Sequence, residues 1–474
     1  MSSAAANSTQ ISELSNNYDS TRFVDREREL NYIAGLCDAA ATPGGTSSGV
    51  VNFWGIKGSG KTWLLHRLKD RYQYRPPQFP YQKPTLTAYF SFEQNKGVRP
   101  AEAARALAHA FSAQVLRQIN HIISEAEKQL LESVQETGAL DSFVRVFRQL
   151  TDNFAPLLML DTCENISSDV WREIELEIIE PLVRTNRVIF VVAGRQYVRQ
   201  WHRFEVRRRV ASFTNTLVSP FNKETALQQI QRGNYQLDRS PELFVEEVYR
   251  YSGGNPFMVD LFARSARTRS DIVRLINENE ATLLGIGKDW RPLIEQLAPL
   301  RFYRGDSLRF MLAVDNSEEE SRPDNYYLSI LRDLDAASEV VWWDHGKKAY
   351  VTSPPVRQMI NLRQSLEERT RDSFVAQHRQ AIAMYRSQLE KYPRTSDDYV
   401  LEIWFHLANI YLATEGREGL EKELQDVLPL VDPLDSDSTN SLQKALEADQ
   451  ELLDLLPTEM SQLLLQELKN RLEK

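Results

Sequence analysis

The chain has 474 residues, 42% of them hydrophobic and 26% charged, and a formal net charge of −9. This composition is ordinary for a globular protein with buried cores, and the length suggests about three domains. The charge argues against bulk packaging of nucleic acid, two cysteines exclude a disulfide framework, and no apolar run reaches the ~20 residues that cross a bilayer. Because no signal peptide opens the chain either, the sequence predicts a cytoplasmic protein with no membrane partner.

The first predicted elements surround a glycine-rich loop. Residues 1–20 are rich in Ser, Ala and Asn and are expected to be a disordered tail. A helix is expected over Phe23–Cys37, and a strand over Val50–Trp54 leads into GIKGSGKT at Gly55–Thr62. A second helix is expected over Lys61–Tyr72. A strand, a glycine loop and a helix in this order are the context that a phosphate-binding loop requires.

Strands and helices then alternate as far as residue 220. The expected strands are Thr85–Phe92, Leu157–Leu160, Arg187–Ala193 and Asn215–Val218. The expected helices are Ala101–Ile123, Glu125–Val134 and Val170–Val183. Such alternation is typical of a mostly parallel sheet with helices on both faces, so an α/β P-loop NTPase core is predicted over 21–220.

The rest of the chain reads as three smaller regions. A helical lid is predicted over 221–287, and three helices followed by a β-hairpin predict a winged helix over 288–363. The region 364–474 is predicted to be an all-α TPR-like module, with helix pairs near Ser373–Tyr392 and Tyr399–Glu415. The helices expected in the lid and winged helix are Lys223–Arg232, Pro241–Tyr251, Pro256–Arg264, Trp290–Gln296, Ser307–Leu312 and Tyr326–Asp335.

The glycine loop matches G-x-x-x-x-G-K-[ST] in full. Gly55, Gly58 and Gly60 allow backbone turns in which successive N–H groups face phosphate oxygens. The N-terminus of the following helix adds a partial positive charge. A glycine-rich turn without a ligand is the alternative, and the flanking strand and helix disfavour it.

The end of the motif supplies the chemical groups. Lys61 is expected to provide a cation for the β and γ phosphates, and the Thr62 hydroxyl is expected to bind Mg²⁺. Ser59 and Trp63 complete the predicted nucleotide contacts in the loop. The predicted cofactors are therefore ATP or ADP together with Mg²⁺.

Acidic residues follow the expected strand Leu157–Leu160. Asp161 ends that strand and is expected to hold Mg²⁺ through water. Thr162 occupies the next position, where a catalytic acid usually stands, and the following acid is Glu164. Because hydrolysis needs a carboxylate to orient and deprotonate the attacking water, Glu164 is the candidate base. Alternatively, Glu164 is a surface acid and hydrolysis is slow.

Arginines gather after the last long strand. Arg195 follows Arg187–Ala193, where it would approach the γ-phosphate and report hydrolysis; equally, it would face solvent on an Arg-rich helix within 195–210. Arg207–Arg209 would be trans-acting arginines of an oligomer, nucleic-acid contacts or a solvated face, and the solvated face is expected for any one of them.

Several segments together carry a family resemblance. GIKGSGKT, FVDREREL, LMLDTCEN, VVAGR and GGNP resemble motifs of the STAND class of signal-transduction ATPases, close to the archaeal and bacterial ATPase branch of AAA+-like proteins. The resemblance implies that Phe23 and Arg26 approach the adenine, that Asp161 and Glu164 form the Walker B acids, and that Pro256 lies against the base. It covers about residues 21–365 and implies a winged helix followed by a helical repeat module.

The chain departs from that family in three ways. Plant and animal relatives carry a Met-His-Asp triplet whose histidine contacts the ADP β-phosphate, but the matching segment here reads VTSPPVRQMI. Asp344 and His345 lie in the expected hairpin, where turn chemistry explains them better. Only about 20 residues precede the core, so no fused effector domain is expected, and the C-terminal module is short at about 110 residues.

The resemblance implies a regulatory switch. ADP would hold the winged helix closed, a protein partner or effector would bind the C-terminal helices, and ATP would replace ADP in an open form. The open form would assemble into a nucleotide-dependent homo-oligomer or engage a separate effector, as in bacterial signalling or defence, and slow hydrolysis would reset it. Protease or nuclease activity is not expected, since no H-E-x-x-H or triad signature is present.

Two other hypotheses remain open. The first is a DNA-binding initiator-like or transcription-regulating ATPase that uses the winged helix. The expected recognition helix Tyr326–Asp335 holds one Arg beside two Asp, the hairpin adds only Lys347 and Lys348, and the C-terminal region is acidic, so nucleic acid is not favoured. The second is a scaffold that binds nucleotide without turnover.

Overall fold

The protein is described by a computed structural model that divides into two compact units, Met1–Leu275 and Ile276–Lys474. The described residues are 18–42, 49–73, 83–93, 97–198, 201–212, 216–284, 289–313, 322–391, 397–414, 416–432 and 434–472. Most of the predicted N-terminal tail therefore lies outside the described residues. Within these ranges, no helix is both long and apolar enough to cross a membrane.

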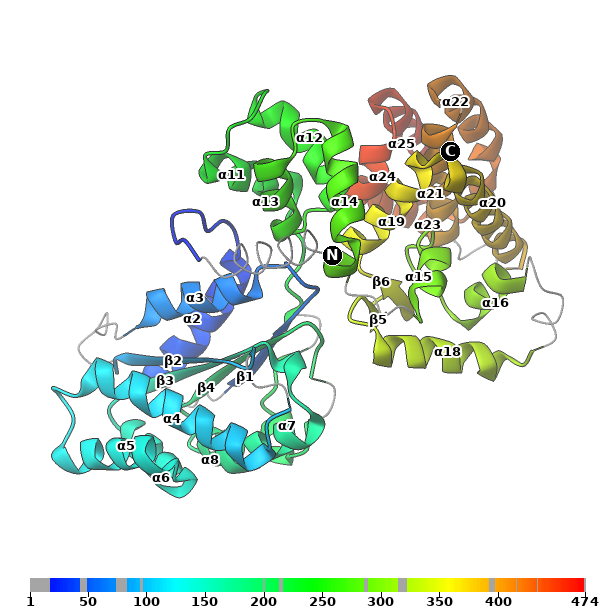
Figure 1. Cartoon of the computed structure of the whole chain (residues 1–474). Helices are drawn as coiled ribbons and strands as arrows, with labels where there is room; N and C mark the ends of the chain where they lie inside the picture. Colours follow the sequence, from blue (N-terminus) through cyan, green and yellow to red (C-terminus); the bar gives the residue numbers. More distant parts are fainter. Residues whose placement is uncertain are drawn as a thin grey trace. The chain divides into compact units, whose positions relative to one another are not determined.

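The first unit is built on a parallel sheet with the strand order β1-β4-β3-β2 (Figure 1). Its strands are β1 (Gly49–Trp54), β2 (Thr85–Ser91), β3 (Ala155–Asp161) and β4 (Ile189–Gly194). In the register of the sheet, Trp54 pairs with Gly194 and Ser91 pairs with Asp161. The carboxyl ends of all four strands therefore lie at one edge, and the segments that follow them converge there.

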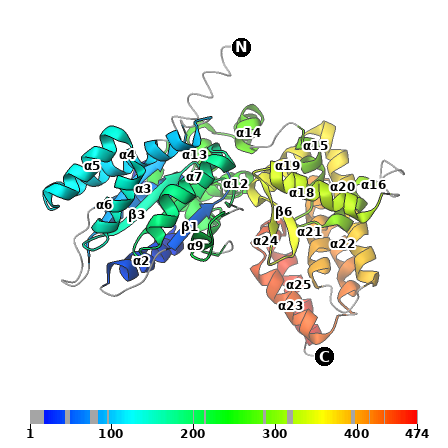
Figure 2. The ribbon, with the colours of Figure 1, turned by 90° about the horizontal axis from the view of Figure 1, so that it is seen from below.

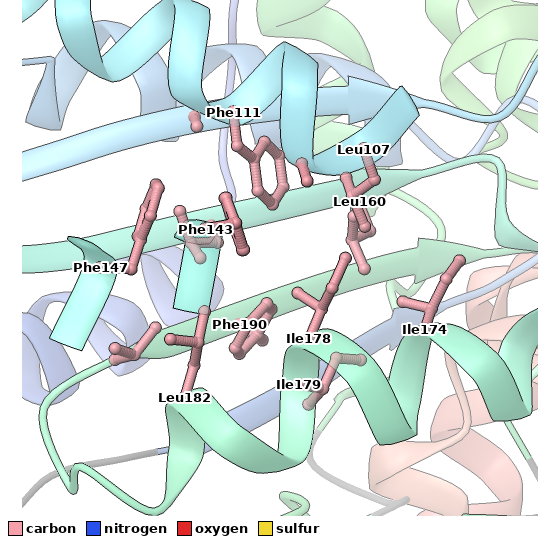
Figure 3. Packing of buried hydrophobic residues seen from close by; sticks show 14 of the residues in the cluster. Leu107, Phe111, Phe143, Phe147, Leu160, Ile174, Ile178, Ile179, Leu182 and Phe190 are labelled. Carbon is pink, nitrogen blue, oxygen red and sulfur yellow. The ribbon is translucent and has the colours of Figure 1, made fainter. Parts of the chain in front are cut away.

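Helices cover both faces of this sheet, as the alternating sequence pattern predicts. On one face, α2 (Glu27–Ala41) and α3 (Lys61–Tyr72) pack on strand residues such as Phe53 and Met159. The opposite face carries α4 (Pro100–Ile119), α5 (Glu125–Thr137), α6 (Leu140–Leu150), α7 (Ser168–Ile174) and α8 (Glu180–Val183). Figure 3 shows the second layer, in which Phe111, Phe143 and Phe190 meet between the sheet and its helices. The α/β prediction is confirmed, although α6 was not among the expected helices.

The helix predicted over Val170–Val183 is interrupted by a π-helical turn at Glu175–Ile179. Pro181 has no N–H to donate to the carbonyl of Glu177, which favours a wider turn here. The Glu175 carboxylate is buried and accepts the backbone N–H groups of His202 at 2.8 Å and Arg203 at 2.6 Å. The turn thus ties this helix to the segment that follows β4.

Two predictions after β4 are wrong. Among the described residues of 195–210, only α9 (Phe204–Arg207) is helical, so Arg195 does not lie in one long Arg-rich helix, which was one of the two alternatives for it. Glu205 accepts from both Arg208 and Arg209. A strand was expected over Asn215–Val218; Asn215 lies outside the described residues, and 216–218 form no regular strand. Isolated parallel bridges from Val50 to Val210 and from Trp54 to Leu217 extend the sheet instead.

The three predicted lid helices are present in the first unit. They are α11 (Lys223–Gly233), α12 (Pro241–Ser252) and α13 (Pro256–Ser265), and the unpredicted α14 (Arg269–Leu284) follows them. Side chains of Asn222, Ser240 and Asn255 accept backbone N–H groups at the starts of the first three helices. These caps and the prolines at 241 and 256 account for where the helices begin.

After the end of α14, which crosses the boundary between the units, the second unit has the helix and hairpin order that the sequence predicts for a winged helix. Its elements are α15 (Arg291–Leu297), α16 (Gly305–Ala313), α18 (Asp324–Ala337), β5 (Val341–Asp344) and β6 (Ala349–Thr352). A single antiparallel bridge between Tyr303 and Tyr350 pairs a third segment of the chain with strand β6 of the hairpin. The Asp344 carboxylate accepts the N–H groups of Gly346 and Lys347, which is the expected turn chemistry.

The remainder of the second unit is helical (Figure 2). Its helices are α19 (Pro354–Leu366), α20 (Glu368–Lys391), α21 (Asp397–Ala413), α22 (Gly416–Val427), α23 (Ser436–Ala448), α24 (Gln450–Leu455) and α25 (Thr458–Leu472). The predicted pair is present as α20 and α21, which pack along one another. The assignment of this region as TPR-like stays a prediction.

A buried ionic network joins the hairpin region to the C-terminal helices. The Arg301 side chain is 10% exposed and lies 2.6 Å from Glu402 of α21, and it also pairs with Asp449 before α24. Arg357 of α19 pairs with Glu451 of α24. These pairs are among the contacts between the two regions predicted to meet at 363/364, which lie in one compact unit.

A histidine pair lies in the same core. The Nδ1 atoms of His378 in α20 and His406 in α21 are 2.8 Å apart, so one donates and the other accepts. Burial lowers the pKa of His378 to about 3, and the nearby Arg357 acts in the same direction. Burial lowers the pKa of His406 well below its ordinary value as well. Both rings are therefore neutral in the folded protein at neutral pH.

Candidate functional site

The glycine loop connects β1 to α3 at the carboxyl edge of the sheet. Gly55, Gly58 and Gly60 have φ values of 154°, 81° and 90°, which strain any residue with a side chain. A Cβ on Gly58 would also lie 2.6 Å from Cβ of Phe257, and a Cβ on Gly55 would lie 3.0 Å from the carbonyl oxygen of Val218. The loop shape therefore depends on glycine at these places.

Lys61 lies across its own loop. Its ammonium group donates to the carbonyl of Gly55 at 2.6 Å, to that of Ile56 at 2.9 Å and to the Ser59 hydroxyl at 3.2 Å. These acceptors are neutral, and hydrogen bonds from an ammonium group to an anion are stronger. An anion that enters the loop would therefore compete well for this cation.

Thr62 and Asp161 meet at the same edge. Asp161 is 3% exposed, and its carboxylate accepts from the Tyr89 hydroxyl at 2.9 Å and from the N–H of Thr162 at 2.8 Å. Burial raises the pKa of Asp161, while hydrogen bonds from Thr62 and Tyr89 and the charge of Lys61 oppose that rise. The two predicted metal ligands therefore lie near each other at this edge.

These oxygen donors suit a hard divalent cation such as Mg²⁺. Within the described ranges, no group of three or more His, Cys, Asp or Glu side chains is arranged to hold a metal ion. A cation at Thr62 and Asp161 would therefore take its other oxygens from phosphate groups and water, which is how Mg²⁺ is commonly held beside nucleotides.

Glu164 and Arg195 pair with each other. Nε of Arg195 lies 2.9 Å from Oε1 of Glu164, and the Arg195 backbone N–H donates to Oε2 at 3.2 Å. The Arg195 side chain is 28% exposed and the Glu164 side chain is 15% exposed. Arg195 therefore does not lie in a helix, and its side chain contacts Glu164 instead of extending freely into solvent. The pair leaves further donors on Arg195 and further acceptor sites on Glu164 for a phosphate or a water molecule.

Arg26 lies against the loop backbone. It is 4% exposed and donates to the carbonyls of Ser59 and Ser219, both at 2.8 Å, while its guanidinium lies 4.6 Å from the ring centre of Phe221. Phe23 is buried beneath Arg67. Contacts of Phe23 and Arg26 with adenine stay predictions. In the structure, Arg26 precedes the first residue of α2 and holds the loop through the Ser59 carbonyl.

The remaining predicted contacts lie on α3 and α13. Trp63 packs edge-on against Tyr18, with ring centres 5.4 Å apart. Pro256 is the first residue of α13, and its carbonyl accepts from Gln229 at 2.9 Å. Its contact with a base likewise stays a prediction.

Sequence reasoning missed two residues of this site. Tyr89 reaches Asp161 from the neighbouring strand, and no local pattern marks that contact. Asn255 donates to the carbonyl of Lys57 at 3.0 Å. The Asn-Pro pair that opens α13 is a helix-start signal that would have drawn attention to Asn255, but not to its contact with the loop.

The site can therefore bind an anionic ligand beside a cation. It combines a glycine loop, an ammonium group, a helix N-terminus and a buried carboxylate, and an acid paired with an arginine lies next to them. Phosphate groups accompanied by a divalent cation are the ligand chemistry that these groups fit best.

Comparison with known proteins gives one relative in sequence. No family model matches the chain. It is 25% identical over 269 residues to an uncharacterised ATP-binding protein of Methanocaldococcus jannaschii, covering 50% of this chain and 70% of that protein.

Solved structures give only weak similarity. Cdc6p from Pyrobaculum aerophilum is 13% identical with a TM-score of 0.27, covering 73% of this chain and 98% of that one. A RuvB variant from Thermotoga maritima is 12% identical with a TM-score of 0.35, covering 72% and 95%. Drosophila ORC bound to DNA is 12% identical with a TM-score of 0.30, covering 74% and 90%. Similarity at these TM-scores supports no inference about this chain.

Proposed function

We propose that the protein binds ATP and ADP with Mg²⁺ and acts as a slowly hydrolysing regulatory switch of the STAND type. The observation that carries the proposal is the convergence of the glycine loop, Lys61, Thr62 and Asp161 at one edge of a parallel sheet. The similarity to an ATP-binding protein of Methanocaldococcus jannaschii supports an adenine nucleotide as the ligand.

Each residue has a role in this proposal. Lys61 leaves the loop carbonyls to neutralise the β and γ phosphates. Thr62 directly and Asp161 through water would hold Mg²⁺, which would neutralise phosphate charge when bound. Glu164 orients and deprotonates the attacking water, and Arg195 responds to the γ-phosphate. Arg195 contacts the Glu164 carboxylate, so the acid that orients the water lies beside the arginine that responds to the γ-phosphate.

The switch itself involves the second unit. A protein partner or effector binds the C-terminal helices, the winged-helix region is released, and ATP replaces ADP. The ATP-bound form then assembles or engages a separate effector. The alternative of a DNA-binding ATPase has less support, because the exposed charges of α18 are Arg332 against Asp324 and Asp333, a poor surface for phosphates.

Nucleotide binding and phosphate release test the site. Titration calorimetry should detect ADP and ATP binding, and the purified protein should release phosphate slowly. Lys61→Ala should weaken binding by about 10- to 100-fold, since it removes a charge-assisted hydrogen-bond donor, and should abolish release. Lys69→Ala, at the other end of α3, is the matched control and should change neither.

Three results would separate the hypotheses. Turnover that survives Lys61→Ala would overturn the site assignment, and no heat with any adenine nucleotide would overturn the proposal. Binding without phosphate release would favour the scaffold hypothesis.

Size-exclusion chromatography tests the switch. A slowly hydrolysed ATP analogue should shift the protein to a larger species, or to a different elution volume, relative to ADP. Identical elution with both nucleotides would count against nucleotide-driven assembly. Nucleotide-dependent binding to a DNA duplex at physiological salt would favour the initiator-like alternative.

A further inference from the structure

Three consecutive carbonyls of the glycine loop are bonded to groups from outside the loop. The carbonyl of Lys57 accepts from Nδ2 of Asn255 at 3.0 Å, and that of Gly58 accepts from the Phe257 N–H at 3.2 Å. The carbonyl of Ser59 accepts from Arg26 at 2.8 Å. Two of the three donors belong to the first turn of the lid helix α13 or its cap, so the lid holds the loop directly.

Both the oxygen and the nitrogen of the Asn255 side-chain amide form hydrogen bonds. It is 3% exposed, and its Oδ1 accepts the N–H groups of Phe257 at 3.1 Å and Met258 at 3.2 Å, which begins α13. Its Nδ2 is the donor to Lys57. One side chain therefore both starts the lid helix and fixes a peptide of the loop.

The contact between lid and loop leaves no room for a side chain. A Cβ on Gly58 would lie 2.7 Å from Oδ1 of Asn255 as well as 2.6 Å from Phe257. The turn before α13 is equally tight: Gly254 has a φ of 74°, and a Cβ there would lie 2.0 Å from the carbonyl oxygen of Phe221. The position of α13 on the loop is therefore closely defined.

These carbonyl contacts also orient the N–H groups of the loop. In a trans peptide the C=O and the following N–H point in opposite directions. Holding the carbonyls of Lys57 and Ser59 toward Asn255 and Arg26 therefore turns the N–H groups of Gly58 and Gly60 the other way. A loop whose N–H groups point together to one side is what an anion requires.

We propose that Asn255 is a positioning residue that couples the lid to the phosphate site. With α13 docked, the loop peptides are held ready for phosphate groups; with α13 released, they are free to rotate and the affinity for phosphate falls. This inference rests on the proposed nucleotide-binding function. By reciprocity, a bound nucleotide strengthens the docking of α13.

The decisive variant is Asn255→Asp. Aspartate still caps α13, but it presents an acceptor in place of the donor to the Lys57 carbonyl. ADP affinity, measured by calorimetry, should fall about three- to tenfold from the loss of one hydrogen bond and further because the new carboxylate repels phosphate groups. The neutral variant Asn255→Ser isolates the first effect. Asn222→Asp is the matched control, because Asn222 caps α11 in the same way and accepts the Thr225 N–H at 2.8 Å. It should leave ADP affinity unchanged.

Hydrogen exchange provides a readout without ligand. Amides of Gly58–Thr62 and of the first turn of α13 should exchange faster in Asn255→Asp than in the wild type and the control. In the wild type, ADP should slow exchange in α13 as well as in the loop. Asn255→Ser, which caps well but is too short to reach Lys57, should repeat the result if the aspartate variant does not fold.

The two proposals fail in different ways. A wild-type protein that binds no adenine nucleotide would end the proposed function, while loop exchange in the ligand-free variants would still test the coupling. Wild-type ADP affinity and unchanged loop exchange in Asn255→Asp or Asn255→Ser would overturn the coupling alone.

Discussion

Charged groups gather in both units of the molecule, but their surroundings differ. In the first unit, Lys61 rests on neutral carbonyls of a glycine loop, and Glu164 and Arg195 form a partly exposed pair. In the second unit, Arg301 is enclosed between Glu402 and Asp449. Lys61 can exchange its neutral partners for an anionic ligand, and the pair near it is partly exposed, whereas Arg301 is buried with two acids beside it.

This difference shows that burial and charge do not by themselves mark a functional site. Glu402 and Asp161 are both buried acids whose pKa burial raises. Only Asp161 lies beside a glycine loop and a helix N-terminus, which can receive an anion. The charges around Glu402 are balanced by their own partners and stabilise the fold. Four measurements test this contrast.

The largest effect is expected for Glu402→Ala. Removing one partner leaves Arg301 buried beside a single acid, which should lower the free energy of unfolding by about 3–5 kcal/mol. Chemical denaturation should show the loss, and hydrogen exchange should place it in α20 and α21. Glu447→Ala, at an exposed position of α23, is the control. A loss below about 1 kcal/mol for Glu402→Ala would mean that the network is not a structural core.

The next effect concerns acid and the histidine pair. Because burial holds the pKa of His378 and His406 below 6.5 in the folded state, the unfolded chain binds more protons as the pH falls from 6.5 toward 3. Stability is therefore fully present above pH 6.5 and is lost below it, by about 2–3 kcal/mol for both rings between pH 7 and 5.5.

Denaturant titrations at the two pH values check this dependence. The double variant His378→Asn, His406→Asn should lose most of it, and His345→Asn, at an exposed position of the hairpin, should keep it. A wild-type protein equally stable at both pH values would contradict the burial of neutral rings.

A smaller effect is expected for Tyr89→Phe. The Tyr89 hydroxyl fixes one oxygen of Asp161, so its loss should raise the Mg²⁺ concentration for half-maximal ATP binding about tenfold. A fluorescent ATP analogue titrated with Mg²⁺ measures this. Tyr32→Phe, on an exposed part of α2, should match the wild type. If Tyr89→Phe also matches the wild type, Asp161 is not the metal ligand or does not need this partner.

The smallest effect is expected for Arg208→Ala. Its side chain is 52% exposed and pairs with Glu205, so the free energy of unfolding should change by less than about 0.5 kcal/mol. Arg209→Ala should cost more, because that side chain is 11% exposed and also donates to Asn186 at 2.8 Å. Equal losses in a denaturation assay would contradict this ranking of neighbouring arginines.

Helices, strands and the glycine loop were predicted correctly where neighbouring residues in the sequence mark them. The run from Gly49 to Tyr72 carries its strand, loop and helix in adjacent residues, and the lid helices carry their own caps and prolines. Parallel strands place their ends at one edge, so the meeting of Thr62 with Asp161 also followed from the pattern.

Contacts between residues that are far apart in the sequence could not be predicted. Tyr89 and Asp161 are 72 residues apart, and Asn255 and Lys57 are 198 apart. The arginines of 195–210 resemble one helix in the sequence, but Arg195 and Arg203 pair with Glu164 and Glu180, which lie elsewhere in the chain. Composition identifies such charges, but only the fold assigns their partners.

The π-helical turn at Glu175–Ile179 has a consequence for how this segment can vary. It adds one residue to the helix, so α8 is rotated by about 100° relative to an uninterrupted continuation of α7. Deleting any one residue there would straighten the helix and turn Glu180 away from Arg203 or Glu175 away from the N–H groups of 202 and 203. The segment should therefore tolerate many substitutions and no change of length.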